Sequence, residues 1–251
     1  MDKIQTNIII GEITLYTGPM YAGKSNQVVE VVEACIKNNE NFICFKHTFD
    51  DNRFGKNEVV SRTGKKTIAT SVANYKNIKT EVEKNEKIKT IKTIIIDELQ
   101  FFGIDNKEEV EGFIKMLQNF SKQGKKIILA GLDKDFKNEY FPLTKRLIED
   151  GLIQNENIKY LKATCSVKNC CENGTCTARI IENKELIDVG NGTKYKAVCH
   201  KHHNYNEKIN YNEIEWKNED EISGTKNKKK DKNWQNRVKK RNSYCCGMFK
   251  L

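Results

Sequence analysis

The feature that most constrains the fold is a glycine-rich segment near the N-terminus, which fits the pattern G-x-x-x-x-G-K-[ST]. Its eight residues are Gly18, Pro19, Met20, Tyr21, Ala22, Gly23, Lys24 and Ser25. Glycines let a backbone wrap closely around phosphate oxygens, and a following helix presents its positive end to them. Lys24 can reach the β- and γ-phosphates, and the Ser25 hydroxyl can ligate Mg²⁺. The segment follows a strand expected at 11–17 and opens a helix expected at 25–37, so we predict a triphosphate-binding loop.

The rest of the first half alternates apolar strands with amphipathic helices, which is typical of a mostly parallel sheet covered by helices. We expect further strands at 41–46, 92–97 and 126–132, and helices at 106–124 and 142–151. The segment from 50 to 85 is polar with weak periodicity, and we expect it to include a flexible loop. The sequence therefore predicts an α/β fold like that of P-loop NTPases over residues 1–160.

Two acidic residues, Asp97 and Glu98, follow the apolar run Ile94-Ile95-Ile96. A carboxylate at the end of a buried strand can hold Mg²⁺, which makes Asp97 the candidate for that role. Glu98 is then free to act as a general base. An acidic pair after a strand is more often a helix cap or a solvated turn, but the phosphate loop reverses that balance. This combination predicts phosphate-bond chemistry and does not separate a kinase from a GTPase or an ATPase.

Five of the nine cysteines lie between 165 and 199, and three histidines lie beside the last of them. The set consists of Cys165, Cys170, Cys171, Cys176, Cys199, His200, His202 and His203. Four soft or borderline ligands in two pairs describe a structural Zn²⁺ site, which can hold together a domain too small to form its own core. We expect such a zinc-binding domain at 161–215.

The net charge of +10 is concentrated at the C-terminus. From Lys226 onward there are ten basic residues and one acidic residue, which leaves +1 for residues 1–225. We expect 216–251 to be a disordered, solvated tail. A nuclear-import signal or a nucleic-acid contact is the alternative reading of the tail, although a nucleic-acid-binding body should itself be basic. Without a visible secretory signal or a long apolar run, we expect a cytoplasmic protein with reduced cysteines.

Five segments together resemble the cytosolic-type (type II) thymidine kinases. In chain order they are the phosphate loop, Asp51-Asn52-Arg53-Phe54, Asp97-Glu98-Leu99-Gln100-Phe101-Phe102, Ala130-Gly131-Leu132-Asp133-Lys134-Asp135-Phe136 and Val198-Cys199-His200-Lys201-His202. They cover about residues 11–205 in the order of that family. The resemblance implies transfer of the γ-phosphate of ATP to the 5′-hydroxyl of thymidine, and of deoxyuridine. It also implies dTTP as a feedback inhibitor and a homotetramer.

The resemblance also implies roles for individual residues. Glu98 would take the proton from the 5′-hydroxyl. Besides the phosphate loop, the ATP-binding residues would be Asp51, Arg53, Asp97 and Gln100. The nucleoside would be bound by Phe101 and Phe136, by Tyr195, and by a lasso loop that precedes Tyr195 and corresponds to Asp188, Val189, Gly190, Asn191 and Gly192. Without the resemblance, ordinary core packing is the more common role for such phenylalanines.

A family T-x-R segment, resembled by Thr177-Ala178-Arg179, selects Cys170 as the second zinc ligand. The implied set is Cys165, Cys170, Cys199 and His202, while Cys171 and Cys176 stay open as alternatives to Cys170. Three positions depart from the family pattern. Leu99 replaces a common Gly or Ala, Lys162 stands where a Thr often lines the base pocket, and Arg62 replaces a histidine of the flexible loop.

Overall fold

The computed structural model describes residues 11–51, 55–62, 64–84, 90–181, 194–203, 209–218 and 221–222. By its internal contacts the chain divides into two units, Met1–Trp216 and Lys217–Leu251. The first unit contains both the sheet and the cysteine-rich region. Within the described residues, no helix combines the length and the apolar character needed to cross a membrane.

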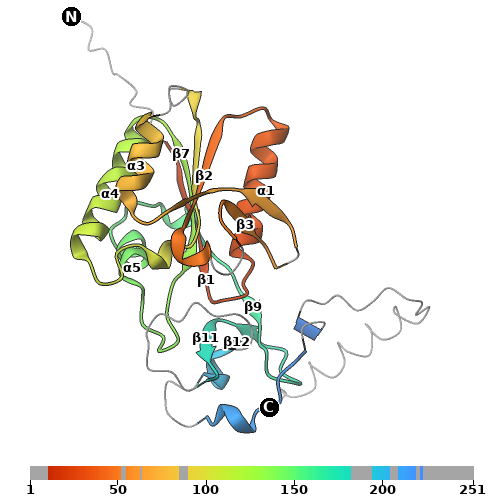
Figure 1. Cartoon of the computed structure of the whole chain (residues 1–251). Helices are drawn as coiled ribbons and strands as arrows, with labels where there is room; N and C mark the ends of the chain where they lie inside the picture. Colours follow the sequence, from red (N-terminus) through yellow and green to blue (C-terminus); the bar gives the residue numbers. More distant parts are fainter. Residues whose placement is uncertain are drawn as a thin grey trace, which may run out of the picture. The chain divides into compact units, whose positions relative to one another are not determined.

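Six strands of the first unit form one sheet in the order β5-β2-β6-β7-β1-β8, and every neighbouring pair is parallel (Figure 1). Their bounds are β1 Ile13–Gly18, β2 Phe42–His47, β5 Thr70–Val72, β6 Thr93–Ile96, β7 Lys126–Leu132 and β8 Ile158–Tyr160. The buried apolar runs of the central strands suit a sheet that is covered on both faces. The predicted α/β class is confirmed.

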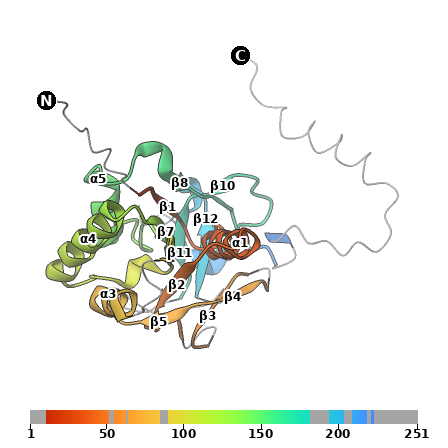
Figure 2. The ribbon, with the colours of Figure 1, turned by 90° about the horizontal axis from the view of Figure 1, so that it is seen from above.

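Helices cover the two faces of this sheet, with α1 on one face and α3, α4 and α5 on the other (Figure 2). Their bounds are α1 Lys24–Lys37, α3 Tyr75–Lys84, α4 Lys107–Lys122 and α5 Pro142–Glu149. Strand β6 shows why both faces are apolar. Ile94 and Ile96 pack with the α3–α5 side, whereas Ile95 packs with α1, because successive strand residues point to opposite faces.

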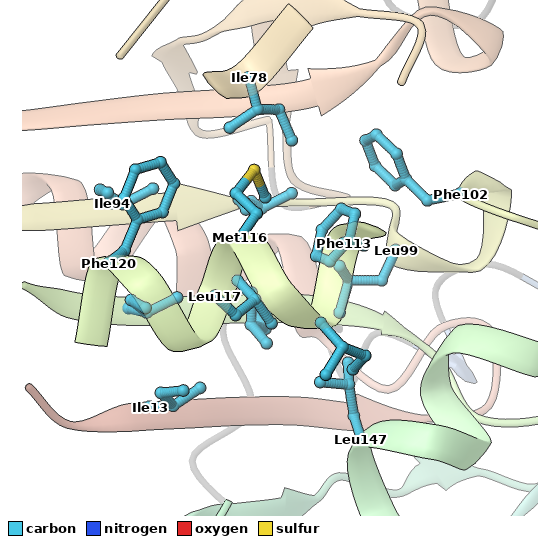
Figure 3. Packing of buried hydrophobic residues seen from close by; sticks show 14 of the residues in the cluster. Ile13, Ile78, Ile94, Leu99, Phe102, Phe113, Met116, Leu117, Phe120 and Leu147 are labelled. Carbon is cyan, nitrogen blue, oxygen red and sulfur yellow. The ribbon is translucent and has the colours of Figure 1, made fainter. Parts of the chain in front are cut away.

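The larger of the two apolar layers surrounds helix α4 (Figure 3). Phe113, Leu117 and Phe120 of this helix are buried against the sheet. The Asn106 side chain accepts a hydrogen bond from the Glu109 N–H at 3.0 Å and caps the start of α4. Gly124, with φ of 74°, follows its end. The predicted helix at 106–124 and the predicted strand at 126–132 therefore match the structure to within two residues.

The segment from 50 to 85 contains more regular structure than its sequence indicates. Strands β3 (Glu58–Val60) and β4 (Lys66–Ile68) form an antiparallel hairpin, which precedes β5 and α3. The hairpin strands have three residues each, which is too short for a clear alternation of apolar residues. Strand β8, an edge strand of the six-stranded sheet, also has three residues and was not predicted for the same reason.

The cysteine-rich region consists of two small antiparallel hairpins. Strand β9 (Ala163–Thr164) pairs with β10 (Asn173–Gly174), and β11 (Cys176–Arg179) pairs with β12 (Tyr195–Val198). Its small buried cluster contains Cys165, Cys176 and Cys199 together with apolar residues such as Val198.

Candidate functional site

The phosphate loop connects β1 to α1 at the carboxyl edge of the parallel sheet. Gly18 has φ of +135°, and a Cβ at this position would lie 2.2 Å from the carbonyl oxygen of Leu161. Gly23 has φ of +87° and open space around it. Gly18 is therefore required for both conformation and space, whereas Gly23 is required for conformation alone.

Two residues of the loop connect it to the β11–β12 hairpin. The Met20 N–H donates to the Thr177 Oγ1 at 3.0 Å, and the Tyr21 hydroxyl donates to the carbonyl oxygen of Tyr195 at 3.1 Å. The Lys24 Nζ donates to the loop carbonyls of Gly18 and Pro19 at 3.1 and 2.6 Å. The loop is thus supported by the cysteine-rich region as well as by the sheet.

The structure brings Ser25 and Asp97 together, as the sequence predicts for a magnesium site. Asp97 directly follows strand β6 and is only 3% exposed. Burial first, and then the negative charge of Glu98, raise the pKa of Asp97 to about 8, while a hydrogen bond with Ser25 acts in the opposite direction. A buried carboxyl group beside the phosphate loop is well placed to be ionised by a bound cation.

Glu98 is held at the same edge of the sheet by Gln100. Its backbone has φ of 59°, which is uncommon for a residue other than glycine. The Gln100 amide nitrogen donates to a Glu98 carboxylate oxygen. The Gln100 amide oxygen accepts from the Leu132 N–H at 3.0 Å, at the end of β7. This buried amide therefore fixes the Glu98 side chain relative to the sheet.

Asp51 belongs to a buried charge network that sequence reasoning missed. The Lys46 Nζ is fully buried and lies 3.4 Å from an Asp50 oxygen and 3.3 Å from an Asp51 oxygen. It donates to the carbonyl of Gly55 at 2.6 Å, and the Ser71 hydroxyl donates to Asp51 at 2.6 Å. The available signal was a lysine at the end of an apolar strand, since a buried lysine requires partners.

The predicted aromatic residues fall into two places. Phe101 is half-buried and its ring lies 5.6 Å from that of His47 and 5.5 Å from that of Phe49. Phe136 lies under the guanidinium of Arg179, whose Cζ is 3.7 Å from the ring centroid. Arg179 in turn contacts Tyr195.

Phe102 is an ordinary core residue, 5.1 Å from Phe113 between ring centroids. The predicted residues Arg53, Asp188, Val189, Gly190, Asn191 and Gly192 lie outside the described residues.

The three departures from the family pattern have different surroundings. Leu99 is buried, and a Cβ on Gly131 would lie 2.6 Å from its Cβ, so the two positions pack closely. Arg62 stacks on the phosphate loop, with its Cζ 3.5 Å from the ring centroid of Tyr21. Lys162 is exposed and lines a surface cavity that also contains Glu172 and His200. The structure therefore gives no support to an effect of Lys162 on base selectivity.

Four side chains of the cysteine-rich region form a candidate metal centre. The Sγ atoms of Cys165, Cys170 and Cys199 and one ring nitrogen of His202 all lie within 4.8 Å of one another. His202 Nδ1 is 3.5 Å from the Cys165 Sγ and 3.3 Å from the Cys199 Sγ, and the Cys170 and Cys199 sulfurs are 4.0 Å apart. Zinc bonds of about 2.3 Å to sulfur and about 2.0 Å to nitrogen place tetrahedral ligand atoms roughly 3.5 Å apart. The donor set and its spacing therefore fit Zn²⁺.

The two alternatives to Cys170 lie outside this group of four. Cys171 is exposed. Cys176 is buried, and its sulfur lies 3.9 Å from the Nδ1 of His200. The ligand set implied by the sequence is thus the set that the structure brings together.

Comparison with known proteins identifies the family to which the chain is similar. The family model described as thymidine kinase matches residues 11–203. A thymidine kinase of Thermococcus kodakarensis is 34% identical over 203 residues, which cover 77% of this chain and 94% of that protein. A thymidine kinase of Mycoplasma mobile is 35% identical over 193 residues, which cover 77% of this chain and 87% of that protein.

The likeness to solved structures is weak. Domain III of the Thermotoga maritima replication initiation protein DnaA has a TM-score of 0.36 and 11% identity, and covers 60% of this chain and 55% of that chain. Such a likeness carries no argument about function. The family model, however, spans most of the chain. Two relatives are also about one third identical to the chain over most of their own length. The chain therefore belongs to the thymidine kinase family.

Proposed function

We propose that this phosphotransferase transfers the γ-phosphate of ATP to the 5′-hydroxyl of thymidine, and of deoxyuridine, in nucleotide salvage. Membership of the thymidine kinase family supports this reaction, as do the names of the relatives. The observation that carries the mechanism is the Glu98 carboxylate, which Gln100 holds at the sheet edge beside the phosphate loop.

In this mechanism Glu98 accepts the proton of the 5′-hydroxyl while the 5′-oxygen of the nucleoside forms a bond to the γ-phosphorus. The bond from the γ-phosphorus to the bridging oxygen breaks, and ADP leaves with the electron pair. The loop N–H groups and Lys24 stabilise the charge on the phosphates. Asp51, Arg53 and Gln100 complete the ATP side. Mg²⁺, when bound, would neutralise phosphate charge, and Ser25 and Asp97 would hold it.

On the nucleoside side, Phe101, Phe136 and Tyr195 would provide apolar faces for a planar base. The lasso residues 188–192 would add backbone hydrogen bonds to the base edge. The contact of Phe136 with the Arg179–Tyr195 pair supports a common pocket for two of these three aromatic residues.

The metal centre would hold a structural Zn²⁺ through Cys165, Cys170, Cys199 and His202. Four protein ligands leave no open position for a substrate, so its role would be to stabilise the region that carries Tyr195. Thiol ligands must stay reduced, which supports a cytoplasmic location. Inhibition by dTTP and a homotetramer rest on the family resemblance alone. Inhibition kinetics with added dTTP would test the first, and sedimentation would test the second.

The test is transfer of labelled γ-phosphate from ATP to thymidine, with deoxycytidine as the comparison substrate. The Glu98→Gln variant should lower kcat by about 10²- to 10³-fold because the carboxylate base is lost. Glu83→Gln, which changes an exposed carboxylate on α3, serves as the matched control and should match the wild type.

Two results would contradict the proposal in different ways. If Glu98→Gln kept a kcat within about threefold of the wild type, Glu98 would not be the base. If folded, zinc-loaded wild-type protein phosphorylated no nucleoside, the reaction itself would be wrong.

A further inference from the structure

Arg179 lies between two aromatic residues that come from different parts of the first unit. It is on β11, directly opposite Tyr195 of β12 in the antiparallel ladder, and is only 7% exposed. Its Nε and Nη2 atoms donate to the Tyr195 hydroxyl oxygen at 3.1 and 2.6 Å. The flat face of its guanidinium covers the ring of Phe136, in the loop that follows β7. One side chain thus joins the sheet to the hairpin.

This arrangement uses properties that only arginine combines. A guanidinium is planar, so it can stack on one ring while its edge donates two hydrogen bonds to a second residue. A lysine ammonium in the same place would keep the charge but could not do both. Burial of a cation is costly unless its surroundings compensate, so a buried arginine at this position indicates a specific task.

The same face of the hairpin also contacts the phosphate loop. Thr177 lies two residues before Arg179, and alternate strand residues share a face. The Thr177 hydroxyl accepts from the Met20 N–H, and the Tyr195 carbonyl accepts from the Tyr21 hydroxyl. The position of Phe136 and Tyr195 relative to the phosphate loop is therefore set through one hairpin, which includes Arg179.

We propose that Arg179 is a positioning residue for the nucleoside, which holds Phe136 and Tyr195 in the geometry that receives the base and sugar. The inference rests on the proposed function, since it concerns the nucleoside pocket of that reaction. Arg179 acts through the two aromatic side chains and takes no part in the phosphate transfer.

The test measures the KM for thymidine and the KM for ATP separately in three variants. Arg179→Lys should raise the KM for thymidine about tenfold and leave that for ATP within about twofold, because the stack is lost while the charge stays. Tyr195→Phe keeps the ring and removes the hydroxyl acceptor, so it should act in the same direction to a smaller extent. The double variant should be no worse than Arg179→Lys, since both changes break one shared contact.

A structural role would give a different pattern. Equal increases in both KM values, loss of zinc, or a melting temperature lowered by more than about 5 °C in Arg179→Lys would overturn the proposal. So would an unchanged KM for thymidine in that variant.

Calorimetric binding of thymidine distinguishes this failure from failure of the reaction. A wild type that binds thymidine without phosphorylating it would refute the proposed reaction. The role of Arg179 could still be tested, by comparing the dissociation constants of thymidine for the wild type and Arg179→Lys. A wild type that binds no thymidine would refute both.

Discussion

The sheet and the cysteine-rich region solve the same stability problem in different ways. The sheet buries apolar side chains on both faces, in two clusters that include Ile94–Ile96 and the inner faces of four helices. Among its described residues, the cysteine-rich region has one small cluster, and three of the six buried members of that cluster are cysteines. Burial of apolar area stabilises the first region, whereas we propose that metal coordination stabilises the second. The candidate site includes residues of both regions, so we expect its integrity to depend on both kinds of stabilisation.

The sharpest test of this comparison is removal of the metal. Cys165→Ser should eliminate the zinc, since a tetrahedral site loses a thiolate ligand, and should lower thymidine phosphorylation by at least about 100-fold. ATP binding, which depends mainly on the sheet, should weaken by no more than about fivefold. Metal analysis, phosphate transfer and nucleotide titration measure the three quantities.

Cys171→Ser is the matched control for that variant, because Cys171 is an exposed cysteine outside the four-residue cluster. It should retain zinc and activity. A zinc-free Cys165→Ser protein with full activity would show that the cysteine-rich region does not need a metal.

A second test addresses the sheet. Leu117 is fully buried on α4, and Leu117→Ala should lower the free energy of unfolding by about 2–5 kcal/mol because it removes apolar contacts and leaves a cavity. Added zinc should not restore this loss, in contrast to the first test. Urea denaturation measures it, with exposed Lys115→Ala on the same helix as the control. An effect below about 0.5 kcal/mol would mean that this part of the sheet is not the main source of stability.

The smallest expected effect concerns pH. Burial lowers the pKa of His47 to about 4 from its usual 6.5, although a hydrogen bond to the Ala73 carbonyl acts in the opposite direction. The unfolded chain therefore binds a proton on His47 below about pH 6.5, whereas the folded chain binds it only below about pH 4. The stability gained by keeping His47 neutral is fully present above pH 6.5. As the pH falls from 6.5 to 4, the free energy of unfolding decreases by about 1–3 kcal/mol.

His47→Gln removes this titration, so the difference in unfolding free energy between wild type and variant should change between pH 6.5 and 4. Loss of zinc in acid affects both proteins and cancels in the difference. A difference that stays constant with pH would place the acid sensitivity in the cysteine-rich region instead.

The same contrast explains what could be predicted from the sequence. Elements with long apolar patterns, such as β7 and α4, lie within two residues of their predicted ends, because the sheet buries them on a regular period. The phosphate loop was predictable because its chemistry needs particular residue types in a particular order. The cluster of cysteines and histidines predicted a zinc site in the same way, but the choice of Cys170 over Cys171 and Cys176 came from the family resemblance.

Features that depend on contacts between distant segments could not be predicted. Strands β3, β4 and β8 are too short to show a period, and their neighbours determine them. The charge network of Lys46 depends on Asp51, which also accepts a hydrogen bond from Ser71, 20 positions further along the chain. Arg179 belongs to the T-x-R segment that resembles the family. Its contact with Phe136, however, joins distant parts of the chain and leaves no local sequence pattern.

The hydrogen bond from Met20 to Thr177 also has a consequence for the order of events during synthesis. The two residues are separated by 157 positions, and β1 also pairs with β7 and β8, which follow it by more than 100 residues. A ribosome must translate as far as residue 177 before the phosphate loop can make its final backbone contacts. Folding of this loop therefore comes late in translation, and shorter nascent chains carry an incomplete nucleotide site that is exposed to chaperones and proteases.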